Sequence, residues 1–216
     1  MNARENILGR IRTALGRSAP LADKDNLAMR GKLHSHPRGP LPSMWWEPVP
    51  RFKDRCVQLS STVDEVNNLG DVPSAVAGYL RTRDLPRRGV CWPEFGGLDW
   101  QSAGLQMAGR PATGDDKVGL SGSYCAIAET GTLMLLSGQD THGTTSLLPD
   151  THIAIVQTSR IVRSMEDAFD LLRKEHGRLP RQVAFVSGPS RTADIEMTLV
   201  LGIHGPYRVH IILVGG

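Results

Sequence analysis

Residues 152–157 of the chain read HIAIVQ, and residues 209–214 read VHIILV. Two further runs of the same kind are TLMLLS at 132–137 and VAFVS at 183–187. All four runs are short, apolar and rich in β-branched residues, which is typical of strands buried on both faces of a sheet. They predict four strands in the second half of the chain.

Helical patterns separate the later strands. Ser164 begins a capping-box-like sequence, and the apolar side chains after it share one helical face: Met165, Ala168, Phe169 and Leu172. A second helical stretch is predicted over residues 192–201, ended by Gly202. Strands that alternate with helices need right-handed crossovers. The pattern predicts an α/β fold with a twisted, mostly parallel sheet and helices on both faces.

This α/β domain is predicted to span residues 51–216. In its first part, residues 73–83 suggest a helix and residues 89–92 a short strand, whereas the glycine-rich stretch 94–115 has no clear assignment. Four arginines gather near the end of the predicted helix: Arg81, Arg83, Arg87 and Arg88. We interpret them as solvated surface charge, with contact to a partner as the alternative.

The segment before this domain divides into two parts. Residues 3–15 have apolar side chains at helical spacing, so residues 1–16 are predicted to contain an amphipathic helix. Residues 17–50 hold six of the fourteen prolines and are predicted to be an extended arm or linker without regular structure. The pair Trp45-Trp46 is expected to pin this arm to the domain or to a neighbouring subunit, with ligand recognition as the second interpretation.

Composition excludes several classes of protein. The 216 residues are 40% hydrophobic and 22% charged, which fits a globular protein and excludes a wholly disordered chain. The net charge of +3 is too small for a typical nucleic-acid binder, and the basic excess lies within residues 1–53. No apolar run is long enough for a membrane span. Three separated cysteines favour a reduced, cytoplasmic setting and cannot ligate a four-cysteine iron–sulfur cluster.

Glu129 is the first candidate for chemistry. It is the only charged residue between Val118 and Gln139, within the apolar sequence AIAETGTLML. A carboxylate in such surroundings is costly unless it is hydrogen-bonded or acts as an acid, base or nucleophile. The alternative is that Glu129-Thr130-Gly131 forms the turn of a hairpin, with Gly131 at positive φ and Glu129 solvated.

His152 is the second candidate because it begins a predicted strand and could move protons with Glu129 if the two side chains meet. No pair of histidines has metal-ligand spacing, so no metal site is predicted. The competing interpretation is a structural histidine at a strand edge.

The segment SGPSRTAD at residues 187–194 is the third candidate. A strand that enters a tight turn and then a helix would present backbone N–H groups and hydroxyls to an anion. The predicted binding residues are Ser187, Gly188, Ser190, Arg191, Thr192 and Asp194, with Arg191 able to contact a carboxylate or phosphate. The alternative is that Ser190 or Thr192 only caps the helix.

Three of these segments carry a resemblance to a known family. AIAETGTLMLLSG (126–138), TTSLLPDTHIAIV (144–156) and SGPSRTADIEMTLVLGIHGPYRVHIILV (187–214) resemble the signatures of the lactate utilization protein C family, which carries the LUD domain. RENILGRIRTAL, which begins at Arg4, is similar to the leading helix of that family. The resemblance implies a fold like that of ribose-5-phosphate isomerase, glucosamine-6-phosphate deaminase and the CoA-transferases.

The resemblance also implies a role in oxidising L-lactate to pyruvate as one of three proteins that act together. The partners would carry the iron–sulfur clusters, and this chain would hold no cofactor. It would bind a small carboxylate or its partners at a face formed by Glu129, His152 and residues 187–194. Whether it also forms a homo-oligomer stays open.

Two other functions remain as alternatives. Family I CoA-transferases use a glutamate as nucleophile, and in their sequence a glycine stands two residues after it. Glu129-Thr130-Gly131 is similar over those three residues. The chain could therefore be a self-sufficient enzyme of acyl or sugar-phosphate chemistry that uses Glu129. The third hypothesis is a binding module that senses a metabolite without turnover.

Overall fold

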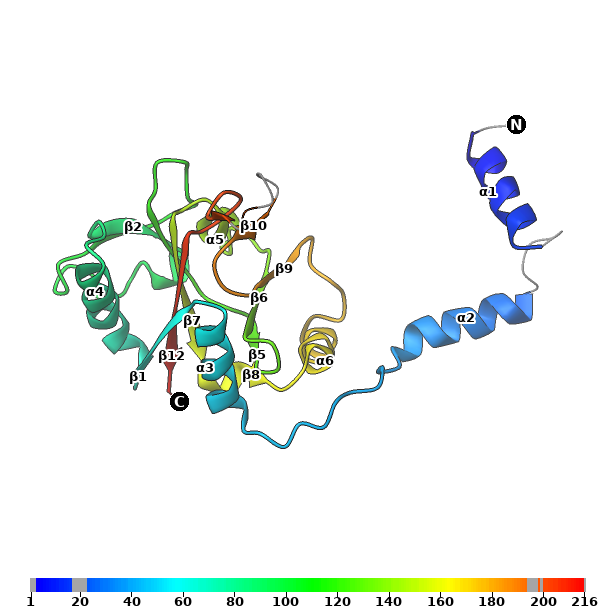
Figure 1. Cartoon of the computed structure of the whole chain (residues 1–216), viewed down its shortest axis with the longest axis horizontal. Coiled ribbons are helices and arrows are strands. Elements are labelled where there is room, and N and C mark those ends of the chain that lie inside the picture. Colours follow the sequence, from blue (N-terminus) through cyan, green and yellow to red (C-terminus); the bar gives the residue numbers. More distant parts are fainter. Residues whose placement is uncertain (1–2, 17–22, 194–197, 199, 216) are drawn as a thin grey trace. The chain divides into compact units, whose positions relative to one another are not determined.

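The computed structural model describes residues 3–16, 23–193, 198 and 200–215, in two units, Met1–Ser43 and Met44–Gly216 (Figure 1). The first unit contains helices α1 (Ala3–Ala14) and α2 (Asp23–Ser35), neither of which has a buried residue. The helix predicted near residues 3–15 is confirmed. The prediction of no regular structure over 17–50 is wrong at α2, which contains no proline and has acidic residues in its first turn and basic ones in its last.

A six-stranded, entirely parallel sheet forms the centre of the second unit. Its order is β1-β12-β7-β4-β2-β3. The strands are β1 (Thr62–Val66), β2 (Arg88–Cys91), β3 (Gln106–Gly109), β4 (Val118–Ser121), β7 (Thr151–Gln157) and β12 (Arg208–Val214). The predicted α/β class is therefore confirmed, with the apolar runs at 152–157 and 209–214 as adjacent central strands.

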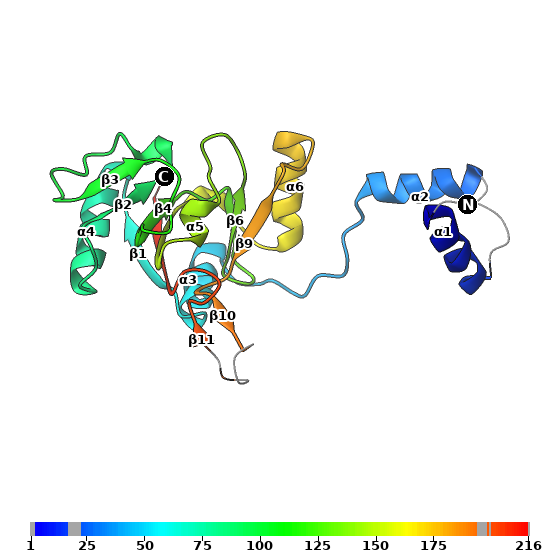
Figure 2. The same ribbon diagram turned by 90° about the horizontal axis from the view of Figure 1, so that it is seen from above.

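Helices cover both faces of this sheet (Figure 2). On one face, Tyr79 of α4 (Val72–Thr82) stacks on His210 of β12. On the other face lies α5 (Thr144–Leu147), where the Thr145 carbonyl packs against Gly119. Helix α3 (Pro48–Gln58) joins the α5 face through the ion pair between Lys53 and Glu65.

A smaller sheet receives the other two predicted strands. Its order is β8-β5-β6-β9, from β5 (Cys125–Ile127), β6 (Thr132–Leu136), β8 (Ile161–Val162) and β9 (Val183–Val186). Helix α6 (Met165–His176) packs on it and begins with the predicted capping box, in which Ser164 and Asp167 exchange hydrogen bonds. The two predicted strands on either side of α6 lie in different sheets, because β7 belongs to the six-stranded sheet and β9 to the smaller one, which corrects the prediction of a crossover within one sheet.

The helix predicted over residues 192–201 is wrong at both ends of that range. There the structure has β10 (Arg191–Thr192) paired antiparallel with β11 (Val200–Leu201), while residues 194–197 and 199 lie outside the described part. Two backbone hydrogen bonds hold the flanking loops: the Ser190 N–H donates to Pro206 and the Gly202 N–H donates to Ser190. These bonds require extended backbone where the apolar spacing suggested a helix.

Three short 3-10 helices complete the described secondary structure of the second unit: η1 (Leu69–Asp71), η2 (Pro93–Phe95) and η3 (Thr158–Arg160).

Two apolar cores stabilise the part of the fold that the structure describes. The larger apolar core lies around the six-stranded sheet, and a smaller one lies between α6 and the smaller sheet. None of the helices in the described residues combines the length and apolar character needed to cross a membrane.

Candidate functional site

Glu129 lies in a hairpin turn, as one of the two interpretations predicted. Strands β5 and β6 pair antiparallel, and the turn between them closes with a hydrogen bond from the Gly131 N–H to Ile127. Gly131 has a φ of +68°, and a Cβ there would lie 2.7 Å from the Cβ of Arg55 in α3. Only glycine fits this approach without strain. The turn is thus held against the carboxyl-terminal part of α3.

The Glu129 side chain is half-buried in this turn, and its backbone N–H donates to the carbonyl of Arg163. Across the described residues, its carboxylate makes no hydrogen bond or ion pair. A carboxylate in such a position can accept hydrogen bonds from a ligand or partner. It also keeps the lone pairs that a general base or nucleophile needs.

Three hydroxyls lead from the Glu129 turn to the loop after β9. Thr130 Oγ1 lies 2.7 Å from Thr132 Oγ1, which in turn lies 2.7 Å from Ser187 Oγ. Thr132 is buried, whereas Ser187 is exposed. This row of hydroxyls joins two of the three predicted site segments, because residues 129–132 and Ser187 meet at one place.

The loop that contains Ser187 also approaches α3 closely. Gly188 has a φ of +83°, and a Cβ there would lie 2.5 Å from the carbonyl oxygen of Leu59, the C-cap residue of α3. The Arg191 guanidinium donates to that carbonyl at 2.9 Å and to Ser60 Oγ at 2.8 Å. Arg191 therefore satisfies the carboxyl end of α3, where a cation is favoured by the helix dipole.

These placements change the physical basis of the predicted anion site. No helix begins at Ser190 or Thr192, so the expected N-terminal dipole is absent there; Thr192 is buried in β10, and Asp194 lies outside the described residues. Arg191 already binds the end of α3. Anion binding at Ser187, Gly188 and Ser190 stays a prediction, now resting on the loop and not on a helix terminus.

His152 lies apart from this cluster. It is fully buried in β7, and its Nε2 is 2.8 Å from Ser121 Oγ, which also lies 2.9 Å from the Gly122 carbonyl. Burial lowers the pKa of His152 to about 4, so the ring is neutral at pH 7. The His152 ring is hydrogen-bonded to Ser121 of β4, whereas the Glu129 backbone is hydrogen-bonded to Arg163. No hydrogen bond or ion pair among the described residues joins His152 to Glu129.

The sequence did not single out the contacts that hold the start of α3. Arg163 donates to the carbonyls of Trp46 and Met44, and the guanidiniums of Arg163 and Arg51 both lie over the Trp46 ring, at 5.8 Å and 5.4 Å from its centroid. Trp46 therefore pins the chain to the domain, while Trp45 is 86% exposed. The only sequence signal was the tryptophan pair itself. Arg51 has no distinctive sequence context, and Arg163 is far from the pair in the chain.

The cysteines do not form a ligand set. Cys56 in α3, Cys91 in β2 and Cys125 in β5 are each buried, and burial raises their pKa values to about 12, 11 and 12. Such thiols stay protonated near neutral pH, whereas metal ligation needs thiolates. Within the described ranges, no three side chains of His, Cys, Asp or Glu gather as metal ligands would.

Comparison with known proteins gives a family. Residues 97–214 match the LUD domain. Over 187 residues the chain is 44% identical to lactate utilization protein C of Geobacillus sp. (strain WCH70), which covers 76% of this chain and 74% of that protein.

Other matches are shorter. Lactate utilization protein C of Bacillus subtilis (strain 168) is 39% identical over 127 residues, and that of Anoxybacillus flavithermus is 40% identical over 97 residues. These matches cover 57% and 45% of this chain, and the chain spans about half the length of each of these two relatives.

A solved structure agrees with the fold. The crystal structure of a DUF162 family protein from Deinococcus radiodurans matches with a TM-score of 0.59 and 26% identity, over 81% of this chain and 100% of that one. The family match, the Geobacillus relative and this shared fold lead to one conclusion: the chain belongs to the LUD domain family and is a homologue of the lactate utilization protein C proteins.

Proposed function

We propose that this chain is a component of a lactate utilization system that oxidises L-lactate to pyruvate. The observation that carries the proposal is the homology with lactate utilization protein C, which reaches 44% identity over 187 residues. The oxidation releases two electrons and two protons from each lactate. In this proposal, iron–sulfur clusters of partner proteins accept the electrons, because the separate, buried and protonated cysteines of this chain do not suit cluster ligation.

The Glu129 turn and the loop at Ser187 are the proposed contact site for a small carboxylate or for the partner proteins. Several features support this assignment: a half-buried carboxylate without a partner among the described residues, a row of hydroxyls that ends at the surface, and two glycines that fix both loops on α3. Fixed donors and acceptors of this kind lose little conformational entropy on binding. The Ser187 and Thr130 hydroxyls would donate to a ligand carboxylate, and Glu129 would accept a hydrogen bond from a ligand hydroxyl or a partner N–H.

The test is L-lactate-dependent reduction of a dye, measured with the chain alone, with the iron–sulfur partner proteins alone, and with the mixture. We expect activity only in the mixture, and a decrease of at least tenfold with Glu129→Gln. The matched control is Glu47→Gln, an exposed N-cap residue at the opposite end of α3 that makes no cap hydrogen bond. Oxidation of lactate by the chain alone, or no activity in any mixture, would contradict the proposed role.

Acyl transfer with Glu129 as nucleophile is the second candidate. Its support is a carboxylate that has no partner in the part of the chain that the structure describes, two residues before a turn glycine at positive φ. The Glu129 carboxylate would attack the thioester carbonyl of an acyl-CoA. The C–S bond would break, CoA would depart as a thiolate, and the acyl group would stay on Glu129 as a mixed anhydride. Incubation with acetyl-CoA followed by hydroxylamine would then convert Glu129 to a hydroxamate, detectable by peptide mass spectrometry. An unmodified Glu129 would exclude this route.

A metabolite-sensing module without turnover predicts a different result. In that case L-lactate or pyruvate raises the melting temperature of the purified chain, while no mixture with partners reduces the dye.

A further inference from the structure

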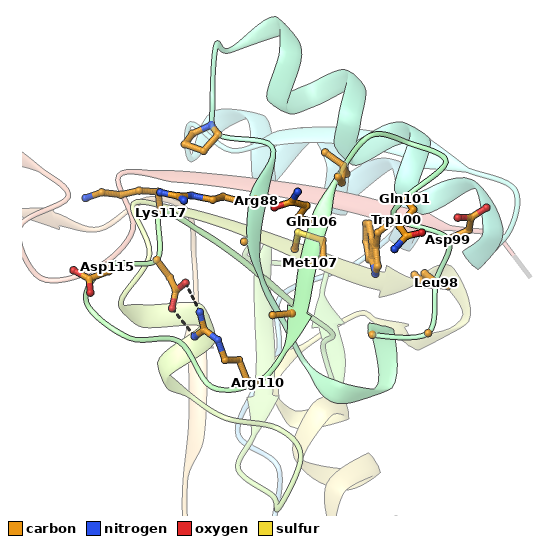
Figure 3. A pocket seen from close by; sticks show the side chains of 17 residues that line it. Arg88, Leu98, Asp99, Trp100, Gln101, Gln106, Met107, Arg110, Asp115 and Lys117 are labelled. Atoms are coloured by element: carbon orange, nitrogen blue, oxygen red, sulfur yellow. Dashed lines mark hydrogen bonds and ion pairs between the residues drawn. The ribbon is translucent and has the colours of Figure 1, made fainter.

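A groove of about 930 Å³ follows β3, the terminal strand of the six-stranded sheet (Figure 3). Its floor includes Gln106, Met107 and Ala108 of β3. One wall comes from the loop before β3, at 96–101, and the other from the loop between β3 and β4, at 110–117. The groove lies outside the Glu129 site, and none of the residues proposed for lactate utilization lines it.

The backbone of β3 has a free edge in this groove. The Gln106 N–H donates to the Arg87 carbonyl on the side of β2. Because the polar groups of successive strand residues point to opposite sides, the N–H and C=O of Met107 point away from β2. No described strand pairs with β3 on that outer side. Unpaired groups of this kind are the template on which an extended peptide adds as a further strand.

Both walls are fixed without help from a ligand. On one side, Arg110 forms a bidentate pair with Asp116 at 2.8 and 2.9 Å, and Asp116 also accepts hydrogen bonds from Thr113. On the other side, Trp100 is buried, and its Nε1 donates to the Phe95 carbonyl at 2.8 Å. Asp99 accepts a hydrogen bond from the Ser102 N–H at 3.1 Å. A groove with such walls is preformed, which reduces the entropy cost of binding.

The two faces at this edge differ in chemistry. Arg88 is the register partner of Gln106 in the adjacent parallel strand, so both side chains lie on one face, and Met107 lies on the other. On the Met107 face, Met107 and Leu98 pack against the apolar core that contains Trp100. Figure 3 shows Arg88 and Lys117 extending on the side of β3 away from Trp100.

The cationic side can accept an acidic group. Arg88 is exposed and makes no ion pair within the described ranges. Lys117 pairs with Asp150 at 3.1 Å, but both side chains are more than half exposed, so water or another carboxylate replaces this pair at little cost. On the wall formed by residues 110–117, Asp116 is neutralised by Arg110. Asp115 is the other acidic residue that lines this wall.

We propose that this groove binds an extended segment of a partner protein that adds to β3 as a seventh strand of the sheet. Its side chains would alternate between acidic residues facing Arg88 and Lys117 and apolar residues facing Met107, Leu98 and Trp100. The backbone of the segment would pair with the N–H and C=O of Met107. Main-chain hydrogen bonds would supply the affinity, and the acidic–apolar alternation would supply the specificity.

The probe for the test is a dye-labelled hexapeptide with blocked ends that alternates valine and glutamate. A second peptide replaces each glutamate by lysine. Binding to the full chain is measured by fluorescence anisotropy, and amide hydrogen exchange is followed at residues 105–110. We expect the glutamate peptide to bind at least tenfold more tightly than the lysine peptide and to slow exchange of the Met107 amide.

Three variants complete the test. Arg88→Glu should weaken binding of the glutamate peptide at least tenfold and improve binding of the lysine peptide. Met107→Pro removes the outward N–H and should abolish binding, with circular dichroism and the melting temperature used to show that the variant folds. The matched control is Arg81→Glu, an exposed charge reversal on α4 outside the groove, which should change binding less than twofold.

Equal binding of both peptides, or equal binding by wild type and Arg88→Glu, would overturn the proposal. Slowed exchange at residues 106–109 that increases with protein concentration in the absence of peptide would identify a second copy of the chain as the occupant. That result would also overturn the proposal of an acidic partner segment.

Discussion

The Thr132 hydroxyl on β6 lies 2.7 Å from the Ser187 hydroxyl, in the loop that follows β9. Thr132 is also within 2.7 Å of Thr130, next to Glu129. The contact ties two segments that are far apart in sequence into one polar cluster beside the carboxyl end of α3. This contact joins the Glu129 turn to the 187–191 loop in the proposed site.

Replacement of Thr132 by valine tests this link. Valine keeps the shape of the buried side chain and removes the hydroxyl, so the free energy of unfolding should fall by about 1 kcal/mol. Urea denaturation measures the change. A double-mutant cycle with Ser187→Ala should give a coupling energy of about 0.5–1 kcal/mol, whereas additive effects would show that the two hydroxyls do not interact.

Gly131 is expected to tolerate no side chain. A Cβ at this position would lie 2.7 Å from the Arg55 Cβ, and the residue has a φ of +68°. Gly131→Ala should therefore lower the free energy of unfolding by about 2–4 kcal/mol, from backbone strain and overpacking together. The control is Gly97→Ala, where a new Cβ would meet nothing within 4 Å. Equal stability of the two variants in urea would contradict the packing of the turn on α3.

Trp46 and Trp45 should differ sharply despite being adjacent. The Trp46 ring contacts the guanidiniums of Arg51 and Arg163 and packs against the core, so Trp46→Ala should cost about 2 kcal/mol of stability. Trp45 is 86% exposed, and Trp45→Ala should change stability by less than about 0.5 kcal/mol. Thermal unfolding of the two variants decides this. A larger loss for Trp45→Ala would refute the assigned anchor.

His152 should make stability depend on pH in a defined window. Its pKa is about 4 in the folded chain, because burial disfavours the charged form, and the ordinary value is 6.5. Between these values the unfolded chain binds the proton more readily, so the free energy of unfolding falls as the pH decreases from about 6.5 toward 4. The stabilisation is complete above about pH 6.5.

His210 shifts in the same direction, again to about 4 and mainly by burial, so the two histidines share this window. At about 1.4 kcal/mol for each unit, His152 accounts for up to about 3 kcal/mol. Urea denaturation of wild type and of His152→Gln at pH 7, 6 and 5 measures the effect. The variant should show a shallower dependence on pH, and His210→Gln serves as the second variant if the first does not fold. Parallel pH profiles for all three proteins would contradict the burial of these rings.

Periodicity predicted the elements whose signal is local. The runs at 152–157 and 209–214 are the central strands β7 and β12, and the capping box at Ser164 begins α6. The hairpin at Glu129, one of the two interpretations of the apolar runs on either side of Gly131, is present in the structure. The same signals could not distribute strands between sheets, because a buried strand of a parallel sheet and one of an antiparallel sheet have similar composition.

Apolar spacing failed at residues 192–201, where strands β10 and β11 lie at the two described ends. Backbone hydrogen bonds from Ser190 and Gly202 hold extended chain there, and such long-range bonds leave no periodic trace in sequence. Proline content likewise misled over 17–50, because the prolines flank α2 and none lies within it.

The sequence by itself determined the α/β class and the central strands and pointed to the family, because each signal depends on residues that are close together in the chain. It left the turn at Glu129 as one of two interpretations. Only the tertiary structure decided which candidates share a site. It placed Ser187 beside the Glu129 turn and left His152 with Ser121 in the core. Among the described strands, it also left β3 at the edge of the sheet with Arg88 beside it. These relationships depend on strand order and register, which are set by packing between distant segments and not by local sequence.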